Sequence, residues 1–92
     1  SSAASDVYKR QDKSQMMVRL VAYEKDLESL KVGCPLLFQI NGLGNKTFHG
    51  KLISIGQEVD DANRSIELYA EMTENSPLFR PGMYVSARMG KK

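Results

Sequence analysis

The side chains that could take part in catalysis or bind a metal ion are few in this sequence. His49 is the only histidine and Cys34 the only cysteine among 92 residues. A nucleophilic mechanism requires a base held beside the nucleophile, and one histidine would have to serve every acid–base scheme. A zinc site requires several converging ligands, which these two residues cannot supply. We therefore expect no catalytic residue, no metal site and no bound cofactor.

Methionine thioethers can bind soft metal ions, and the sequence contains five methionines. Met72, Met83 and Met89 fall on the apolar parity of segments that alternate like strands, where methionine packs readily in a core. Met16 and Met17 are adjacent, which points them to opposite faces of a strand. This spacing favours packing over a joint metal site.

Segment 41–45 contains Gly42 and Gly44 and resembles a phosphate-binding loop in its glycine content. Such a loop requires the N-terminus of a helix directly after it, and usually a Lys followed by Ser or Thr. Here a strand pattern follows, so we interpret the segment as a turn between two strands.

Length and composition favour one small folded domain. Hydrophobic residues make up 41% of the chain and charged residues 26%, and the formal net charge is only +2. This balance is typical of a globular module and gives little support to a polyanionic partner. No apolar run approaches the length of about 18 residues that spans a membrane, and we expect no export signal. The start at Ser1 and Ser2, without an initiator Met, is typical of a piece of a longer protein.

Alternation of apolar and polar residues predicts five strands, in segments 15–23, 35–40, 48–55, 66–72 and 83–89. Segment 24–30 has Leu27 and Leu30 at helical spacing and acidic residues in its first turn, which predicts one short α-helix. A sixth strand is expected around 7–11. Because no long crossover separates the strands, the pattern predicts antiparallel pairing.

We therefore predict a mainly β fold, a small antiparallel β-barrel of five to six strands with one short α-helix, because closure removes exposed edges. The barrel is expected over residues 15–90, after a flexible N-terminal segment, residues 1–14. The core is expected to consist of the residues on the apolar parity of each element, namely Val18, Leu20, Ala22, Leu27, Leu30, Leu36, Phe38, Ile40, Phe48, Leu52, Ile66, Leu68, Ala70, Met72, Met83, Val85 and Ala87.

Four positions are expected to shape the backbone. Gly33 offers a stop for the predicted helix. Gly50 suits a sharply bent barrel strand, where a side chain would be crowded, and the apolar parity slips after Leu52, which predicts a β-bulge. Pro81 and Gly82 predict a type II turn, because proline presets φ at its first corner and glycine accepts positive φ at its second.

A small barrel of the OB type that binds single-stranded nucleic acid is the alternative function. Such barrels stack bases on outward aromatic residues among basic ones. Tyr69, Tyr84, Arg19, Lys51 and Arg88 are the residues that would supply such a face. Acidic residues on both sides of Tyr69 and the low net charge oppose this interpretation. We therefore expect no nucleic acid among the partners.

Three phrases of the sequence resemble the β-barrel domain of membrane fusion proteins, the periplasmic adaptors of tripartite efflux pumps. They are VRLVAYEKDLESLKVG at 18–33, FHGKLISIGQEVDDANRSIELYAEM at 48–72 and LFRPGMYVSARM at 78–89. Each phrase is weak alone, but the ordered set is specific. The resemblance adds Arg64, which follows a tight acidic connection, to Gly33, Gly50, Pro81 and Gly82 as structural residues.

The resemblance implies a periplasmic adaptor whose parent chain is anchored to the inner membrane. Its implied partners are the porter domain of an inner-membrane transporter and other adaptor protomers. An outer-membrane channel would be contacted through parts of the parent chain that lie outside this sequence. Residues 1–14 would then be the exit from the lipoyl-like region, and both cation- and multidrug-efflux pumps use such adaptors.

An adaptor works by contact, and the outward parity carries more apolar and aromatic residues than an isolated barrel needs. We expect part of this surface to be an interface, with the loops around Asn45 and Asp61 as its most exposed contacts. The outward residues are Met17, Val21, Leu37, Ile53, Tyr69 and Tyr84.

Overall fold

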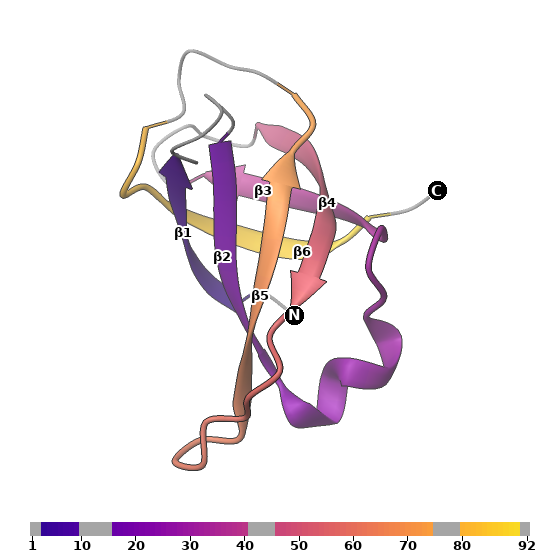
Figure 1. The fold of residues 1–92 in the computed structure, drawn as a ribbon. Helices are drawn as coiled ribbons and strands as arrows, with labels where there is room; N and C mark the ends of the chain where they lie inside the picture. The colour runs from indigo at the N-terminus through magenta and orange to yellow at the C-terminus, as the bar shows by residue number, and fades with distance from the viewer. Residues whose placement is uncertain (1–2, 10–15, 41–45, 75–79, 91–92) are drawn as a thin grey trace.

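The alternating segments form strands that close into a barrel in the computed structural model (Figure 1). The structure describes residues 3–9, 16–40, 46–74 and 80–90. In chain order the elements are β1 (Ala3–Lys9), β2 (Met16–Tyr23), η1 (Glu24–Ser29), β3 (Pro35–Ile40), β4 (Thr47–Ile55), β5 (Ser65–Met72) and β6 (Tyr84–Met89). Every neighbouring pair is antiparallel, and the order around the barrel is β1-β2-β5-β4-β3-β6. The prediction of a small, mainly β antiparallel barrel is confirmed.

The predicted short α-helix is wrong in type, because η1 is a 3-10 helix. It has six residues and no side-chain hydrogen bond at its N-terminal cap, and Leu30 already has extended backbone. A segment this short does not offset the cost of nucleating an α-helix, and short pieces adopt the tighter 3-10 form. Leu27 and Leu30 still pack against the core, as their spacing predicted. No helix of the described residues is long and apolar enough to cross a membrane.

Gly33 does not end this helix, contrary to the expectation. It lies beyond Leu30, in the turn that precedes β3, where its φ of +92° favours glycine. Its N–H donates a hydrogen bond of 2.7 Å to the carbonyl oxygen of Leu52 in β4. Gly33 therefore ties the entrance of β3 to its neighbouring strand.

Among the side chains that the structure describes, the barrel core is one buried cluster, to which β2, β3, β4, β5 and β6 contribute. Every member of the cluster was on the predicted core parity. Ala22, Leu27, Leu30 and Met83 are only partly buried and pack against the cluster, while the side chain of Ile40 lies outside the described part. The cluster consists of Val18, Leu20, Leu36, Phe38, Phe48, Leu52, Ile66, Leu68, Ala70, Met72, Val85 and Ala87.

Gly50 lies in β4 where the barrel wall leaves no room for a side chain. A Cβ atom at this position would overlap the Cε2 atom of Phe38 and the carbonyl oxygen of Glu71. The pairing of β4 with β5 also shifts by one residue between Leu52 and Ser54, which confirms the predicted β-bulge. Both features bend β4 around the core.

Strand β1 closes the barrel by pairing with β2 on one side and β6 on the other. It spans Ala3–Lys9, whereas the sequence predicted a strand around 7–11. The expected sixth strand is therefore present, but it begins and ends earlier in the chain than predicted. The boundary expected between residues 14 and 15 falls among residues outside the described part.

The turn before β6 has the predicted type II features. The N–H of Met83 donates to the carbonyl oxygen of Arg80 over 3.2 Å, and Gly82 between them has a φ of +90°. Pro81 occupies the first corner, where its ring presets φ.

Candidate interaction surface

The outward residues predicted as an interface do not form one surface. Tyr69 lies on β5 and Tyr84 on β6, and two strands separate β5 from β6 in either direction around the barrel. The two tyrosines therefore face opposite sides of the molecule. Tyr84 is 67% exposed, whereas Tyr69 is half-buried.

Met17 is buried, so its expected exposure is wrong. Only 5% of Met17 is accessible, although it does not belong to the main core cluster. On β2 it lies opposite Tyr8 of β1 and Glu71 of β5 in the strand register. A long side chain between two flanking strands is readily covered on the outer face of a sheet.

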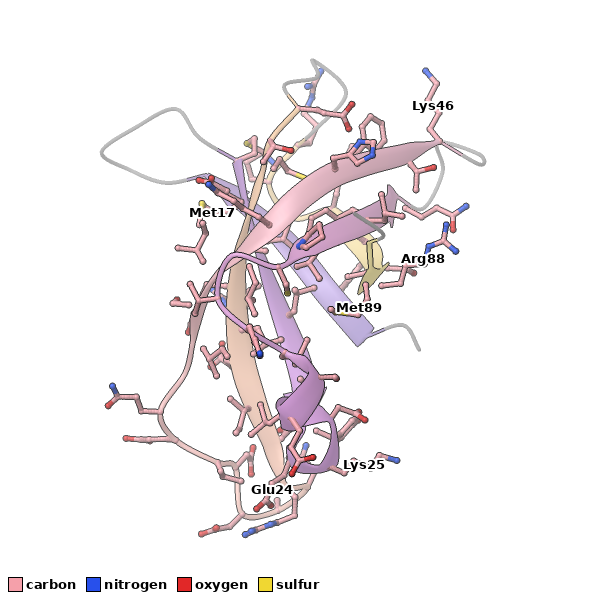
Figure 2. The ribbon with its side chains drawn as sticks, turned by 90° about the vertical axis from the view of Figure 1, so that its right-hand side faces the viewer. Met17, Glu24, Lys25, Lys46, Arg88 and Met89 are labelled. Atoms are coloured by element: carbon pink, nitrogen blue, oxygen red, sulfur yellow. The ribbon has the colours of Figure 1, made fainter. Side chains whose placement is uncertain are left out.

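Met89 shows the opposite departure. It falls on the core parity of β6, but it is the last residue of the strand and is 44% exposed (Figure 2). Leu37, Val21 and Ile53 are half-buried, so the outer face is more covered than the sequence suggested.

The face around Tyr69 carries charges that neutralise one another. Arg19 and Glu67 form an ion pair of 3.5 Å, and so do Lys51 and Glu71. The Tyr69 hydroxyl donates to Glu67 over 3.4 Å. Because two of the basic residues considered for a nucleic-acid face are engaged with carboxylates, this geometry disfavours phosphate binding.

A hollow of about 740 Å³ lies between this face and loop 56–64, which connects β4 to β5. Val21 and Tyr69 come from the barrel wall, and Glu58, Asp60 and Asn63 come from the loop. The hollow joins two of the predicted interface residues to the loop that carries Asp61. It is the part of the predicted interface that the fold brings together.

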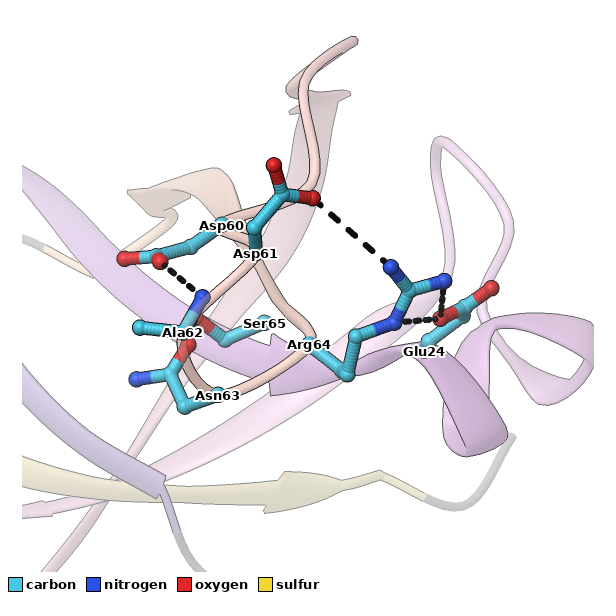
Figure 3. A network of polar contacts seen from close by, with 7 residues as sticks. All are labelled: Glu24, Asp60, Asp61, Ala62, Asn63, Arg64 and Ser65. Carbon is cyan, nitrogen blue, oxygen red and sulfur yellow. Dashed lines mark hydrogen bonds and ion pairs between the residues drawn. The ribbon is translucent and has the colours of Figure 1, made fainter.

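Loop 56–64 ends in a tight turn whose last residue is Arg64. The N–H of Asp60 donates to the carbonyl of Ser65, and the N–H of Arg64 donates to the carbonyl of Asp60, both over 2.8 Å. The Asp60 carboxylate accepts a hydrogen bond of 2.9 Å from the N–H of Ala62 (Figure 3). The Asp61 side chain is 98% exposed, as expected for a contact residue. Asn45, the other expected contact, lies outside the described residues.

The Arg64 guanidinium joins this loop to η1. Its Nε and Nη2 atoms lie 2.8 and 2.7 Å from the same carboxylate oxygen of Glu24 (Figure 3). Its Nη1 atom is 3.8 Å from Asp61, a much weaker contact. Arg64 thus contacts Glu24, a partner that was not predicted, and its structural role stays a prediction.

The position of Glu24 beside Arg64 follows from the pairing of β2 with β5. Strands β2 and β5 are antiparallel, and Tyr23 lies opposite Ser65. Residues 24 and 64 come directly after and before this pair, so they must face each other. Recognising the pair required the strand register, which a single sequence does not specify.

His49 lies on the exposed face of β4, as a surface histidine would. Glu74 accepts hydrogen bonds from the backbone N–H of His49 over 2.5 Å and lies 3.0 Å from its Nδ1. The N–H of Thr73 donates to the carbonyl of His49 over 2.9 Å. The backbone hydrogen bond from His49, followed by the contact with its ring, lowers the pKa of Glu74.

Cys34 is a free, partly buried thiol. Across the described part of the chain, no three His, Cys, Asp or Glu side chains are grouped so that they could hold a metal ion. His49 has a carboxylate neighbour in Glu74, and the described residues add no third ligand beside them. The expectation that these residues act as packing or surface residues stays a prediction.

Comparison with known proteins gives one family match and several similar folds. Residues 17–92 match the family model described as the CusB-like β-barrel domain. The membrane fusion protein Spr0693 from Streptococcus pneumoniae R6 is similar with a TM-score of 0.74 at 21% identity, over 85% of this chain and 35% of that chain. ZneB from Cupriavidus metallidurans is similar with a TM-score of 0.70 at 27% identity, over 83% of this chain and 22% of that chain.

None of the curated proteins matches the chain. The chain spans about a third or less of the two solved structures. The likeness to Spr0693 concerns the fold alone.

Proposed function

Because the chain belongs to the family of CusB-like β-barrel domains of RND membrane fusion proteins, we propose that it is a non-catalytic contact module of a tripartite efflux pump. The observation that carries the proposal is the match of residues 17–92 to this family, on a chain that folds as a closed barrel. Members of this family are periplasmic adaptors. In this role the module links an inner-membrane transporter to an outer-membrane channel.

The partners in this proposal are the porter domain of the transporter and neighbouring adaptor protomers. The channel is reached through other parts of a parent chain anchored to the inner membrane. The exposed Asp61 loop and the hollow beside Tyr69 are the surface we assign to the transporter or a neighbouring protomer. Modest contacts suffice, because several adaptors in one assembly add their contacts through avidity.

Site-specific cross-linking of the full-length parent protein in cells tests this function. Photoreactive residues at Asn45 and at Asp61 probe positions that precede and follow β4 in the sequence. We expect capture of a transporter or adaptor subunit at position 45, at position 61 or at both. A third photoreactive residue at Tyr84 probes the far side of the barrel. Capture of nucleic acid or cytosolic proteins, and of no pump subunit, would overturn the adaptor function and favour the nucleic-acid barrel.

A further inference from the structure

The loop that carries Asp61 is held to η1 by one residue pair, Glu24 and Arg64. Two side-chain contacts of 2.8 and 2.7 Å join them, and the backbone N–H of Glu24 donates to the carbonyl of Arg64 over 3.0 Å. Backbone and side chain thus connect the same two residues, which lie far apart in the sequence. The end of β2 and the start of β5 meet at this point.

Arg64 adopts a backbone conformation that is uncommon for its residue type. Its φ is +55°, in the left-handed region that favours glycine or asparagine, and it has the only positive φ of a non-glycine residue in the described chain. Strained backbone of this kind persists only where surrounding contacts hold it. Here the contacts are the hydrogen bond to Asp60 and the pair with Glu24.

The pair lines one of two hollows to which Asn63 contributes. One, of about 620 Å³, is lined by Tyr23, Glu24, Lys25, Asn63 and Arg64. The other is the 740 Å³ hollow beside Tyr69, to which Asn63 also contributes. A rotation of the loop away from η1 would change the shape of both hollows and the direction of Asp61.

We propose that Arg64 is a positioning residue for the contact with a pump subunit, because its pair with Glu24 sets the direction in which the Asp61 loop is presented. The inference rests on the proposed function. The Arg64 and Glu24 side chains are 60% and 47% exposed, and exposed ion pairs contribute little to stability. The main effect of the pair is therefore on loop direction, while the buried core maintains the barrel.

The test uses two variants of the full-length protein that weaken the side-chain pair in different ways. Arg64→Asn removes the guanidinium but supplies a residue that tolerates the left-handed backbone. Glu24→Gln removes the charge and leaves Arg64 in place. Glu28→Gln is the matched control, because it makes the same change on η1 at a carboxylate that forms no ion pair with a described residue.

The readouts are photo-cross-linking of the transporter or neighbouring adaptor from position 61 and thermal unfolding of the same variants. If the released Asp61 loop spends about one fifth of its time in the direction that the Glu24–Arg64 pair sets, its apparent affinity for the pump subunit falls about fivefold. We expect a cross-linking loss of this order in both variants, none in Glu28→Gln, and a nearly unchanged melting temperature in all three. Equal cross-linking in all proteins would overturn the inference while leaving the proposed function intact.

Amide hydrogen exchange tests the positioning effect without a partner. In Glu24→Gln, the amides of Asp60 and Arg64 should exchange faster, because their hydrogen bonds lie within the released turn. Unchanged exchange would overturn the inference whatever the cross-linking shows. If exchange quickens but the parent protein captures no pump subunit, the proposed function fails and the assignment to a pump contact falls with it.

Discussion

Gly50 lies where a strand backbone and an aromatic ring meet. A methyl group at this position would overlap the Phe38 ring and the Glu71 carbonyl oxygen, and the backbone atom cannot move without breaking the pairing of β4 with β5. We expect Gly50→Ala to lower the free energy of unfolding by about 1 to 3 kcal/mol, the usual cost of overpacking. Urea unfolding monitored by circular dichroism measures this change.

The control for this substitution is Thr47→Ala, an exposed position on the same strand. Surface changes of this kind usually alter stability by less than about 0.5 kcal/mol. If Gly50→Ala proved as stable as Thr47→Ala, the crowding at Gly50 would be refuted.

Glu74 is a single residue that makes the stability of the fold depend on pH. Its pKa is lowered by the hydrogen bond from the backbone of His49 and by the His49 ring, so the ionised carboxylate is favoured in the folded state. The stability that this carboxylate contributes is therefore fully present at neutral pH, above the pKa of Glu74 in the unfolded chain. It is lost as the pH falls through the lowered pKa of Glu74 in the folded state. Glu74→Gln should be less stable than the wild type at neutral pH and equally stable in strong acid.

Titration of the Glu74 side-chain carboxyl by carbon-detected NMR measures the pKa directly. Because the carboxylate is exposed, the difference in stability will be small. A Glu74 pKa at or above that of an unstructured peptide would contradict the hydrogen bonds described.

At the scale of elements, alternation of apolar residues predicted β2, β3, β4, β5 and β6 to within about one residue at their ends. The core cluster followed, because parity alone decides which side chains of a strand point inward. The 3-10 form of η1 could not be predicted, since it depends on absent caps and on the following chain. The burial of Met17 and the exposure of Met89 depend on neighbouring strands and on where a strand ends.

The candidate surface was less predictable than the fold. Outward parity identified Tyr69 and Tyr84, but the strand order that separates them arises from contacts between distant segments. The Glu24–Arg64 pair required the register of β2 with β5. The short polar segments of the sequence carry little information about the order of the strands or about their register.

The turn before β6 permits a test of one element. Gly82 has a φ of +90° and open space where a Cβ atom would lie, so a substitution there strains the backbone without a clash. We expect Gly82→Ala to cost about 1 to 3 kcal/mol of unfolding free energy and Gly82→Asn clearly less, because asparagine tolerates positive φ. Equal losses in chemical denaturation for the two variants would argue against a conformational cause.

At the scale of the whole molecule, one small core supports the barrel. Phe38 is fully buried and Leu68 is 4% exposed, on strands that lie two places apart in the barrel order. Truncating either residue to alanine should cost about 2 to 5 kcal/mol, a large share of the roughly 5 to 10 kcal/mol expected for a domain of this size. Thermal unfolding of both variants measures the loss.

Tyr84→Ala is the exposed control for the two core substitutions. Because Tyr84 is 67% exposed, we expect its truncation to change the free energy of unfolding by less than about 0.5 kcal/mol. A near-native melting temperature for Phe38→Ala, or a large loss for Tyr84→Ala, would contradict the facing of these strands.

Because β1 closes the barrel, the chain cannot be shortened at its N-terminal end without opening the sheet. If the chain began at Gln15, as the expected domain boundary suggests, β2 and β6 would each lose β1 as a neighbour and the barrel would have two open edges. Open edges pair with strands of other molecules, which leads to aggregation. A mixture of such shortened chains with intact ones offers a further route, in which one copy lends its N-terminal strand to another by domain swapping. The first strand is thus what leaves the barrel without an open edge.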